Sequence, residues 1–323
     1  MERHLQEVRL APLSPDRLAA VLDPEARERF EAALEQAARL LEGRIIWNVN
    51  STAAGGGVAE ILRSFLSYAR GSGVNVRWTV ISGPPEFFRL TKRIHNFLHG
   101  EPGDGGSLGE EEAALYREVT AENAEELAET VRPDDIVVLH DPQTAGLTHR
   151  LRETKATVIW RSHVGAEERN ALVDRAWEFL APFVEAADAC VFSRRAYVPP
   201  WASNVRTEII QPSIDPFSPK NEELAPEAVQ AILSHVGLVV APTAGGATPS
   251  YTRQDGTPGR VDRMCELLST GPPPSYDAPL VVQVSRWDRL KDPIGVMMGF
   301  ADRPKDSSEA HLVNWSSAAF ETQ

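Results

Sequence analysis

Two cations that stand five residues apart, Arg286 and Lys291, follow an apolar segment near the end of the 323-residue chain. The segment at 280–285 is typical of a buried strand, and Asp292-Pro293 is a helix start signal. A strand that delivers an Arg and a Lys to its carboxyl end can hold a departing diphosphate, because fixed positive charge stabilises the developing negative charge. Two exposed surface cations would show the same spacing, so the pattern alone leaves both interpretations open.

A second candidate anion site is a glycine run between a predicted strand at 44–50 and a predicted helix at 58–69. The run consists of Gly55, Gly56 and Gly57. Backbone N–H groups of consecutive glycines can approach a ligand closely, and a helix N-terminus favours anions. Glu60 stands where a dinucleotide-binding fingerprint needs glycine, which disfavours a Rossmann dehydrogenase. A tight turn without a ligand is the alternative.

Polar side chains follow the predicted strands at 44–50, 135–140 and 156–160, where ligands of open α/β sheets gather. They are Asn50, His140, Asp141, Gln143, Arg161 and His163. A His-Asp pair at a strand end can orient substrate hydroxyls or transfer protons, or the histidine can fill a polar gap. A metal site is disfavoured because no close-spaced ligand pair occurs. His95 and Asn96 lie near the end of a predicted helix at 84–98. Their side chains either pack within the protein or face the substrate.

Strands and helices alternate at intervals of about 25–40 residues, which predicts the α/β class. We expect a Rossmann-like parallel sheet with helices on both faces. The predicted organisation is an N-terminal helical extension at 1–42, a Rossmann-like domain at 43–240, a mobile linker or insertion at 241–279 that holds a short helix near 260–268, and the start of a second Rossmann-like domain at 280–323.

Composition restricts the class of partner. The net charge of −13 argues against nucleic acid, which needs a basic face. The sequence has no apolar run of about 18 residues and no signal-peptide core at its start, so we expect no membrane span. Two distant cysteines, Cys190 and Cys265, fit reduced thiols in the cytoplasm.

Taken together, the motifs resemble the trehalose glycosyltransferring synthases, which are retaining glycosyltransferases of family four with the two-domain GT-B fold. The matching motifs, in chain order, are WNVNST at 47–52, GGGVAE at 55–60, PEFF at 85–88, HN at 95–96, HDPQ at 140–143, WRSH at 160–163, PSIDP at 212–216 and VSRWDRLKDP at 284–293. Many motifs in one order make the resemblance specific.

The resemblance implies that glucose passes from ADP-glucose or UDP-glucose to free glucose and gives trehalose with retention, without a metal or other cofactor. It implies that Arg286 and Lys291 hold the diphosphate and that His140 lies near the transferred sugar. The glycine run would lie near the donor phosphates, and 43–240 would be the acceptor-binding domain. The acceptor side would hold Asn50, His95, Asn96, Asp141, Gln143, Arg161 and His163.

One family feature is missing. The Glu-x7-Glu pair that grasps the donor has no match after Lys291, where Glu309 and Glu321 stand twelve apart. We therefore expect 280–323 to be a truncated donor domain and transfer by this chain to be weak or absent. A non-catalytic sugar- or partner-binding remnant is the alternative, and a GT-B epimerase is a third class. An open sheet edge would favour pairing with another chain, so a homodimer is a further expectation.

Overall fold

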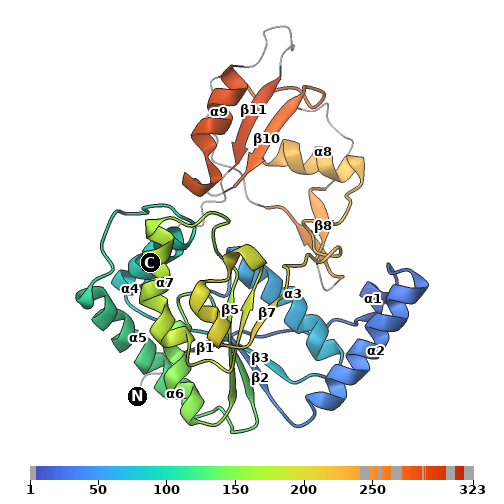
Figure 1. Ribbon diagram of the computed structural model, residues 1–323. Coiled ribbons are helices and arrows are strands. Elements are labelled where there is room, and N and C mark those ends of the chain that lie inside the picture. The colour runs from blue at the N-terminus through green and yellow to red at the C-terminus, as the bar shows by residue number, and fades with distance from the viewer. Residues whose placement is uncertain are drawn as a thin grey trace. The chain divides into compact units, whose positions relative to one another are not determined.

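The computed structural model describes residues 5–240, 248–253, 256–262, 271–285, 287, 289–302 and 310–315 (Figure 1). The chain forms two compact units, Met1–Asp215 and Pro216–Gln323. This division comes earlier than the boundary at residue 240 that the sequence suggested, and 216–240 group with the second unit. Each unit is described by itself below.

The first unit is built on one seven-stranded sheet, in the order β1-β3-β2-β4-β5-β6-β7. Its strands are β1 (Gln6–Glu7), β2 (Ile46–Asn50), β3 (Val76–Val80), β4 (Ile136–His140), β5 (Thr157–Ser162), β6 (Ala189–Phe192) and β7 (Thr207–Ile209). Neighbours from β3 to β7 are parallel, and β1 pairs antiparallel with β3. The predicted parallel α/β sheet is confirmed.

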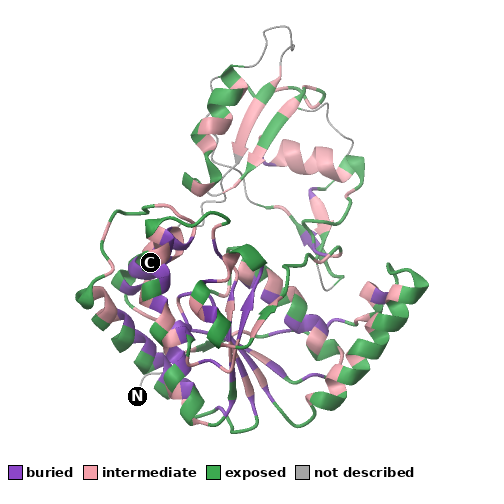
Figure 2. Ribbon diagram, in the orientation of Figure 1, coloured by how far each residue is buried: buried purple, intermediate pink, exposed green. Residues whose placement is uncertain are grey.

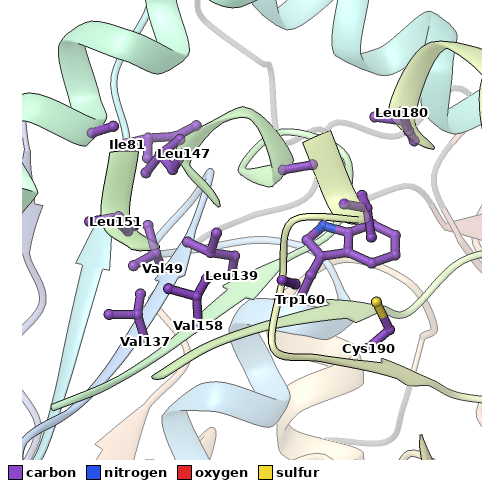
Figure 3. Close-up of a cluster of buried hydrophobic side chains, with 14 of the residues drawn as sticks. Val49, Ile81, Val137, Leu139, Leu147, Leu151, Val158, Trp160, Leu180 and Cys190 are labelled. Atoms are coloured by element: carbon purple, nitrogen blue, oxygen red, sulfur yellow. The ribbon is translucent and has the colours of Figure 1, made fainter. Parts of the chain in front are cut away.

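Side chains alternate across each strand, so each face of the sheet collects its own core. One face carries Trp47, Val137 and Trp160 into the larger apolar cluster. Figure 2 marks buried parts of the strands in purple, and Figure 3 labels Val137 and Trp160 within this cluster. The helices that cover it are α4 (Pro85–Leu98), α5 (Glu110–Ala128), α6 (Thr148–Glu153) after the 3₁₀ turn η1 (Ala145–Leu147), and α7 (Ala171–Val184). Near-continuous apolar strands are what a sheet buried on both faces requires.

The opposite face is covered by α3 (Gly57–Gly71), whose Leu62 and Leu66 pack with Trp78 of β3. Between β1 and β2 along the chain lie α1 (Asp16–Ala19) and α2 (Pro24–Leu40), within the helical extension predicted at 1–42. The Asp23 side chain caps α2 by accepting a hydrogen bond of 2.8 Å from the Ala26 N–H. The 3₁₀ turns η2 (Arg195–Tyr197) and η3 (Pro200–Asn204) lie between β6 and β7.

The strand order contains a switch point. After β2 the chain moves to β3 on one side, and it then crosses to β4 on the other side of β2. Ligands of open α/β sheets bind beyond the carboxyl ends of the strands at such a point. The loop after Asn50 and the segment after His140 therefore lie where a site is expected.

The second unit contains α8 (Pro226–His235), β8 (Ser250–Thr252), β9 (Pro258–Arg260), β10 (Leu280–Val284), η4 (Arg289–Lys291), α9 (Pro293–Ala301) and β11 (His311–Trp315). β10 and β11 are parallel, with α9 between them along the chain, and β8 pairs with β9 as an antiparallel hairpin. A hairpin thus lies inside the predicted linker, whereas the helix predicted near 260–268 falls mainly outside the described residues. In the described parts of both units, no helix is long and apolar enough to span a bilayer.

Candidate functional site

Two stacked histidines form the centre of the candidate site. His140 ends β4 and is 2% exposed, and its Nδ1 lies 2.9 Å from Nε2 of His163. The ring centroids are 5.2 Å apart. Burial lowers the pKa of His140 well below its ordinary value and lowers the pKa of His163 to about 3, and the charge of Arg161 adds to both effects. Both imidazoles are therefore uncharged at neutral pH.

Asp141 follows in a strained backbone conformation, with a φ of 63°. Its Oδ1 accepts a hydrogen bond of 2.7 Å from the backbone N–H of His163, and its own N–H donates to the Arg161 carbonyl at 2.8 Å. Burial raises the pKa of the Asp141 carboxyl to about 7. Backbone strain and a perturbed carboxyl at one residue are typical of a functional position.

Arg161 pairs in register with His140 across β4 and β5. Its Nε atom is buried and hydrogen-bonds to no group in the described part of the chain. Burial lowers the pKa of this guanidinium, while the Asp141 carboxyl raises it. A buried donor without a partner is costly, so such an atom points to a ligand that supplies an acceptor.

Asn50 shapes the loop that follows β2. Its Oδ1 accepts a hydrogen bond of 2.8 Å from Nε1 of Trp78, and its Nδ2 donates to the Thr52 carbonyl at 2.8 Å. Arg63 of α3 adds a hydrogen bond of 2.9 Å to the Ala53 carbonyl. The Asn50 amide, predicted to bind sugar, is thus engaged at both ends within the protein.

The predicted glycine run leads directly into α3. Gly55 and Gly56 have φ values of 77° and 79°, whereas Gly57 begins the helix. The run is exposed, and a Cβ built on any of the three glycines meets no atom within 4 Å. The loop is therefore exposed at the N-terminus of α3, and its contact with a ligand stays a prediction.

The backbone at Gly56 gives the first prediction. Its φ of 79° and ψ of 156° belong to a region that is essentially restricted to glycine. Gly56→Ala should lower the free energy of unfolding by about 1–3 kcal/mol, through backbone strain alone. Gly57→Ala is the matched control and should be neutral or stabilising, because alanine favours the helix. Urea unfolding measures both, and equal effects would contradict the strain argument.

The predicted residues His95 and Asn96 lie in the last turn of α4. The ring of His95 lies 4.8 Å from that of His99. The end of this helix is tied to the segment that follows β5, because Nδ2 of Asn170 donates to the Gly100 carbonyl at 2.9 Å. Gln143 is half-buried in the segment that follows β4.

The predicted diphosphate clamp belongs to the second unit. Arg286 lies outside the described residues. Lys291 ends η4 with an exposed side chain, and its carbonyl accepts a hydrogen bond of 2.8 Å from Nε2 of Gln283. The predicted start of α9 is confirmed, since Asp292 caps it through the Gly295 N–H at 3.0 Å. The role of the two cations stays a prediction.

The sequence interpretation missed two supporting residues. Asn48 is 4% exposed and places its Oδ1 3.1 Å from Nε2 of His140. A polar residue within a buried strand is the signal that could have identified it. The buried Tyr116 hydroxyl donates to the Pro142 carbonyl at 2.6 Å and accepts from the Gly146 N–H at 3.0 Å, which fixes the segment after β4.

The structure thus joins His140, Asp141, Arg161 and His163 through hydrogen bonds and strand pairing at the switch point. The cluster offers donors and acceptors without a charged imidazole, which suits neutral hydroxyl groups better than a cation. Among the described residues, no group of three or more His, Cys, Asp or Glu side chains is arranged to hold a metal ion.

The fold of the chain is of the GT-B type. It matches the Escherichia coli structure described as trehalose-6-phosphate bound with UDP-2-fluoro glucose, with a TM-score of 0.55 at 13% identity, over 84% of this chain and 64% of that one. At this identity the likeness shows the fold alone, and the predicted fold class is confirmed.

The family model of the N-terminal domain of trehalose synthase matches residues 48–199, which hold the whole histidine cluster. Trehalose synthase of Rubrobacter xylanophilus is 31% identical over 89% of this chain and 59% of its own length. Trehalose synthase of Pyrococcus horikoshii is 40% identical over 64% of this chain and 48% of its own length. The resemblance to trehalose synthases that the motifs indicated is confirmed over this segment, and the chain spans about half the length of these relatives.

Proposed function

We propose that the first unit binds glucose as an acceptor and that the chain takes part in transferring a second glucose to it from a nucleotide sugar, giving trehalose with retention. The observation that carries this proposal is the cluster of His140, Asp141, Arg161 and His163 at the carboxyl edge of the sheet, inside the segment that matches trehalose synthase.

The chemistry of the cluster suits a sugar. Uncharged imidazoles can each donate or accept a hydrogen bond. The Nε of Arg161, which has no partner among the described residues, is a donor that needs an acceptor oxygen. Holding an acceptor hydroxyl in one orientation removes much of the entropic barrier to transfer. The described groups act by positioning, and the proposed reaction uses no metal.

The donor side of the proposal rests on Arg286 and Lys291 of the second unit as a clamp for the leaving diphosphate, and on the glycine run of the first unit as a loop for the donor phosphates. The E. coli structure with this fold is described with UDP-2-fluoro glucose bound, which supports a nucleotide-sugar donor. We propose ADP-glucose or UDP-glucose, to be distinguished by offering each donor in turn.

Arg161 provides the binding test. Arg161→Gln should weaken glucose binding at least about tenfold, because a hydrogen bond from a charged group contributes about 1.5–3 kcal/mol. Arg150→Gln is the matched control, since that arginine of α6 pairs with exposed Glu125 of α5 and exposed Glu153 of α6. Calorimetric titration with glucose measures both. Equal affinities for the two variants, or no glucose binding by the unchanged chain, would overturn the proposed acceptor site.

Transfer is tested by trehalose formation from either nucleotide-glucose and glucose. We expect slow turnover by this chain, because no Glu-x7-Glu spacing occurs after Lys291 in its sequence. Robust turnover would contradict the expected weakness and support the transferase. Glucose binding with no product at all would instead favour the non-catalytic sugar-binding alternative.

A further inference from the structure

Asn48 is buried in the middle of β2, where a polar side chain costs free energy unless it is hydrogen-bonded. The register pairs it with Val138, two residues before His140, so the side chains of Asn48 and His140 lie on the same face of the sheet. In the described part of the chain, the Asn48 side chain has one hydrogen bond, in which its Oδ1 accepts from Nε2 of His140 at 3.1 Å, while its Nδ2 has no partner. The contact with His140 is therefore the hydrogen bond that compensates for burying the Asn48 side chain.

This contact determines where the proton of His140 lies. An uncharged imidazole carries one N–H and one bare nitrogen. The Asn48 oxygen can only accept a hydrogen bond, so the proton of His140 is on Nε2 and its Nδ1 is bare.

The same logic extends to His163. Its Nε2 lies 2.9 Å from the bare Nδ1 of His140 and must donate to it. The proton of His163 is then on Nε2, and its own Nδ1 is bare. The side chain is half-buried, and no described residue hydrogen-bonds to that Nδ1.

We propose that Asn48 is a positioning residue that orders both protons, so that His163 presents Nδ1 as an acceptor to a sugar hydroxyl. The sugar as ligand rests on the proposed function, whereas the order of the protons does not. If both histidines were protonated on Nδ1 instead, Nδ1 of His163 would be a hydrogen-bond donor. It would then favour an acceptor atom of a ligand.

The test is a long-range ¹H–¹⁵N correlation spectrum of the full chain with ¹⁵N-labelled histidine at pH 7, assigned with H140Q and H163Q. The unchanged protein should show both histidines protonated on Nε2. Asn48→Ala should change the tautomer ratio of His140 about tenfold, as expected for one lost hydrogen bond, and His163 should follow. Unlike Asn48→Ala, Asn48→Asp should keep both histidines protonated on Nε2, because a carboxylate oxygen is also a hydrogen-bond acceptor.

Asn123→Ala is the matched control. Asn123 is equally buried, but its hydrogen bonds go to the backbone of Ser82 and Val119. It should lower stability without changing either tautomer. A His140 protonated on Nδ1 in the unchanged protein would overturn the proposal, even if Asn48→Ala does not fold.

Titration with glucose separates the two parts of the proposal. The ¹⁵N resonance of His163 Nδ1 should move upfield as the nitrogen accepts a hydrogen bond. Ordered tautomers with no shift would overturn the sugar as the ligand of His163 and leave the role of Asn48 in place. If glucose binds while Nδ1 of His163 is protonated, the order of the protons set by Asn48 is overturned and glucose remains a ligand of the site.

Discussion

Asp135→Ala should lower the free energy of unfolding of the first unit by about 3–5 kcal/mol. Asp135 is fully buried just before β4, at the edge of the sheet opposite the site. Its carboxylate accepts hydrogen bonds from the Ile45 N–H at 3.0 Å and from Nε1 of Trp47 at 3.1 Å. Alanine would leave two buried donors unpaired, each at a cost of about 1–3 kcal/mol. The ion pair of Asp135 with the half-exposed Arg132 contributes less to the free energy of unfolding.

The dependence of stability on pH provides a second measurement of the contribution of the Asp135 carboxylate. Burial works to raise the pKa of Asp135, but hydrogen bonds from Arg132, Ile45 and Trp47 hold it below its usual value. Its stabilising contribution is therefore complete above the unfolded-state pKa of about 4 and is lost as the pH falls further. Urea unfolding at several pH values measures it, with the exposed neighbour variant Asp134→Ala as the control. A loss under about 1 kcal/mol for Asp135→Ala would contradict the argument.

Asp141→Asn should have the opposite effect and stabilise the unit by about 2–4 kcal/mol at pH 8. The folded pKa of about 7 lies above the ordinary aspartate value of 3.8, so the contribution of Asp141 is complete below 3.8 and is lost as the pH rises through 7. Asparagine can still accept the hydrogen bond from the His163 N–H, and it tolerates the positive φ.

The measurement is the difference in stability between Asp141→Asn and the unchanged protein from pH 4 to pH 8. A difference is needed because the buried His140 and His163, with lowered pKa values, act in the opposite sense: they gain stability as the pH rises through this range. Asp134→Asn is the exposed control. A constant difference across the range would contradict a titrating Asp141. The stabilised variant should bind glucose more weakly, as expected where a site stores strain.

Apolar strand runs that alternate with helical segments were sufficient to predict the parallel sheet with helices on its faces. β1 has only two residues and exists because it pairs with β3, which no local pattern encodes. The unit boundary near Asp215 and the hairpin of β8 and β9 likewise depend on contacts between segments.

The site was predictable as far as the strand ends. His140, Asp141, Arg161 and His163 follow from the rule that polar residues gather at the carboxyl edge. The direction of individual side chains was not predictable, because it depends on the register between strands. Asn50 turns to Trp78 and its own loop, whereas Asn48, two residues earlier, reaches His140.

The pairing of β2 with β4 joins two parts of the sheet that come from separate stretches of sequence: β1, β2 and β3 before residue 81, and β4 to β7 after residue 135. Asn48 belongs to the first part and the two histidines to the second. The order of the protons therefore exists only once these two parts have docked. A tautomer signal at His140 would report the completion of folding, and the chain could acquire its acceptor chemistry only as a late, long-range event in assembly.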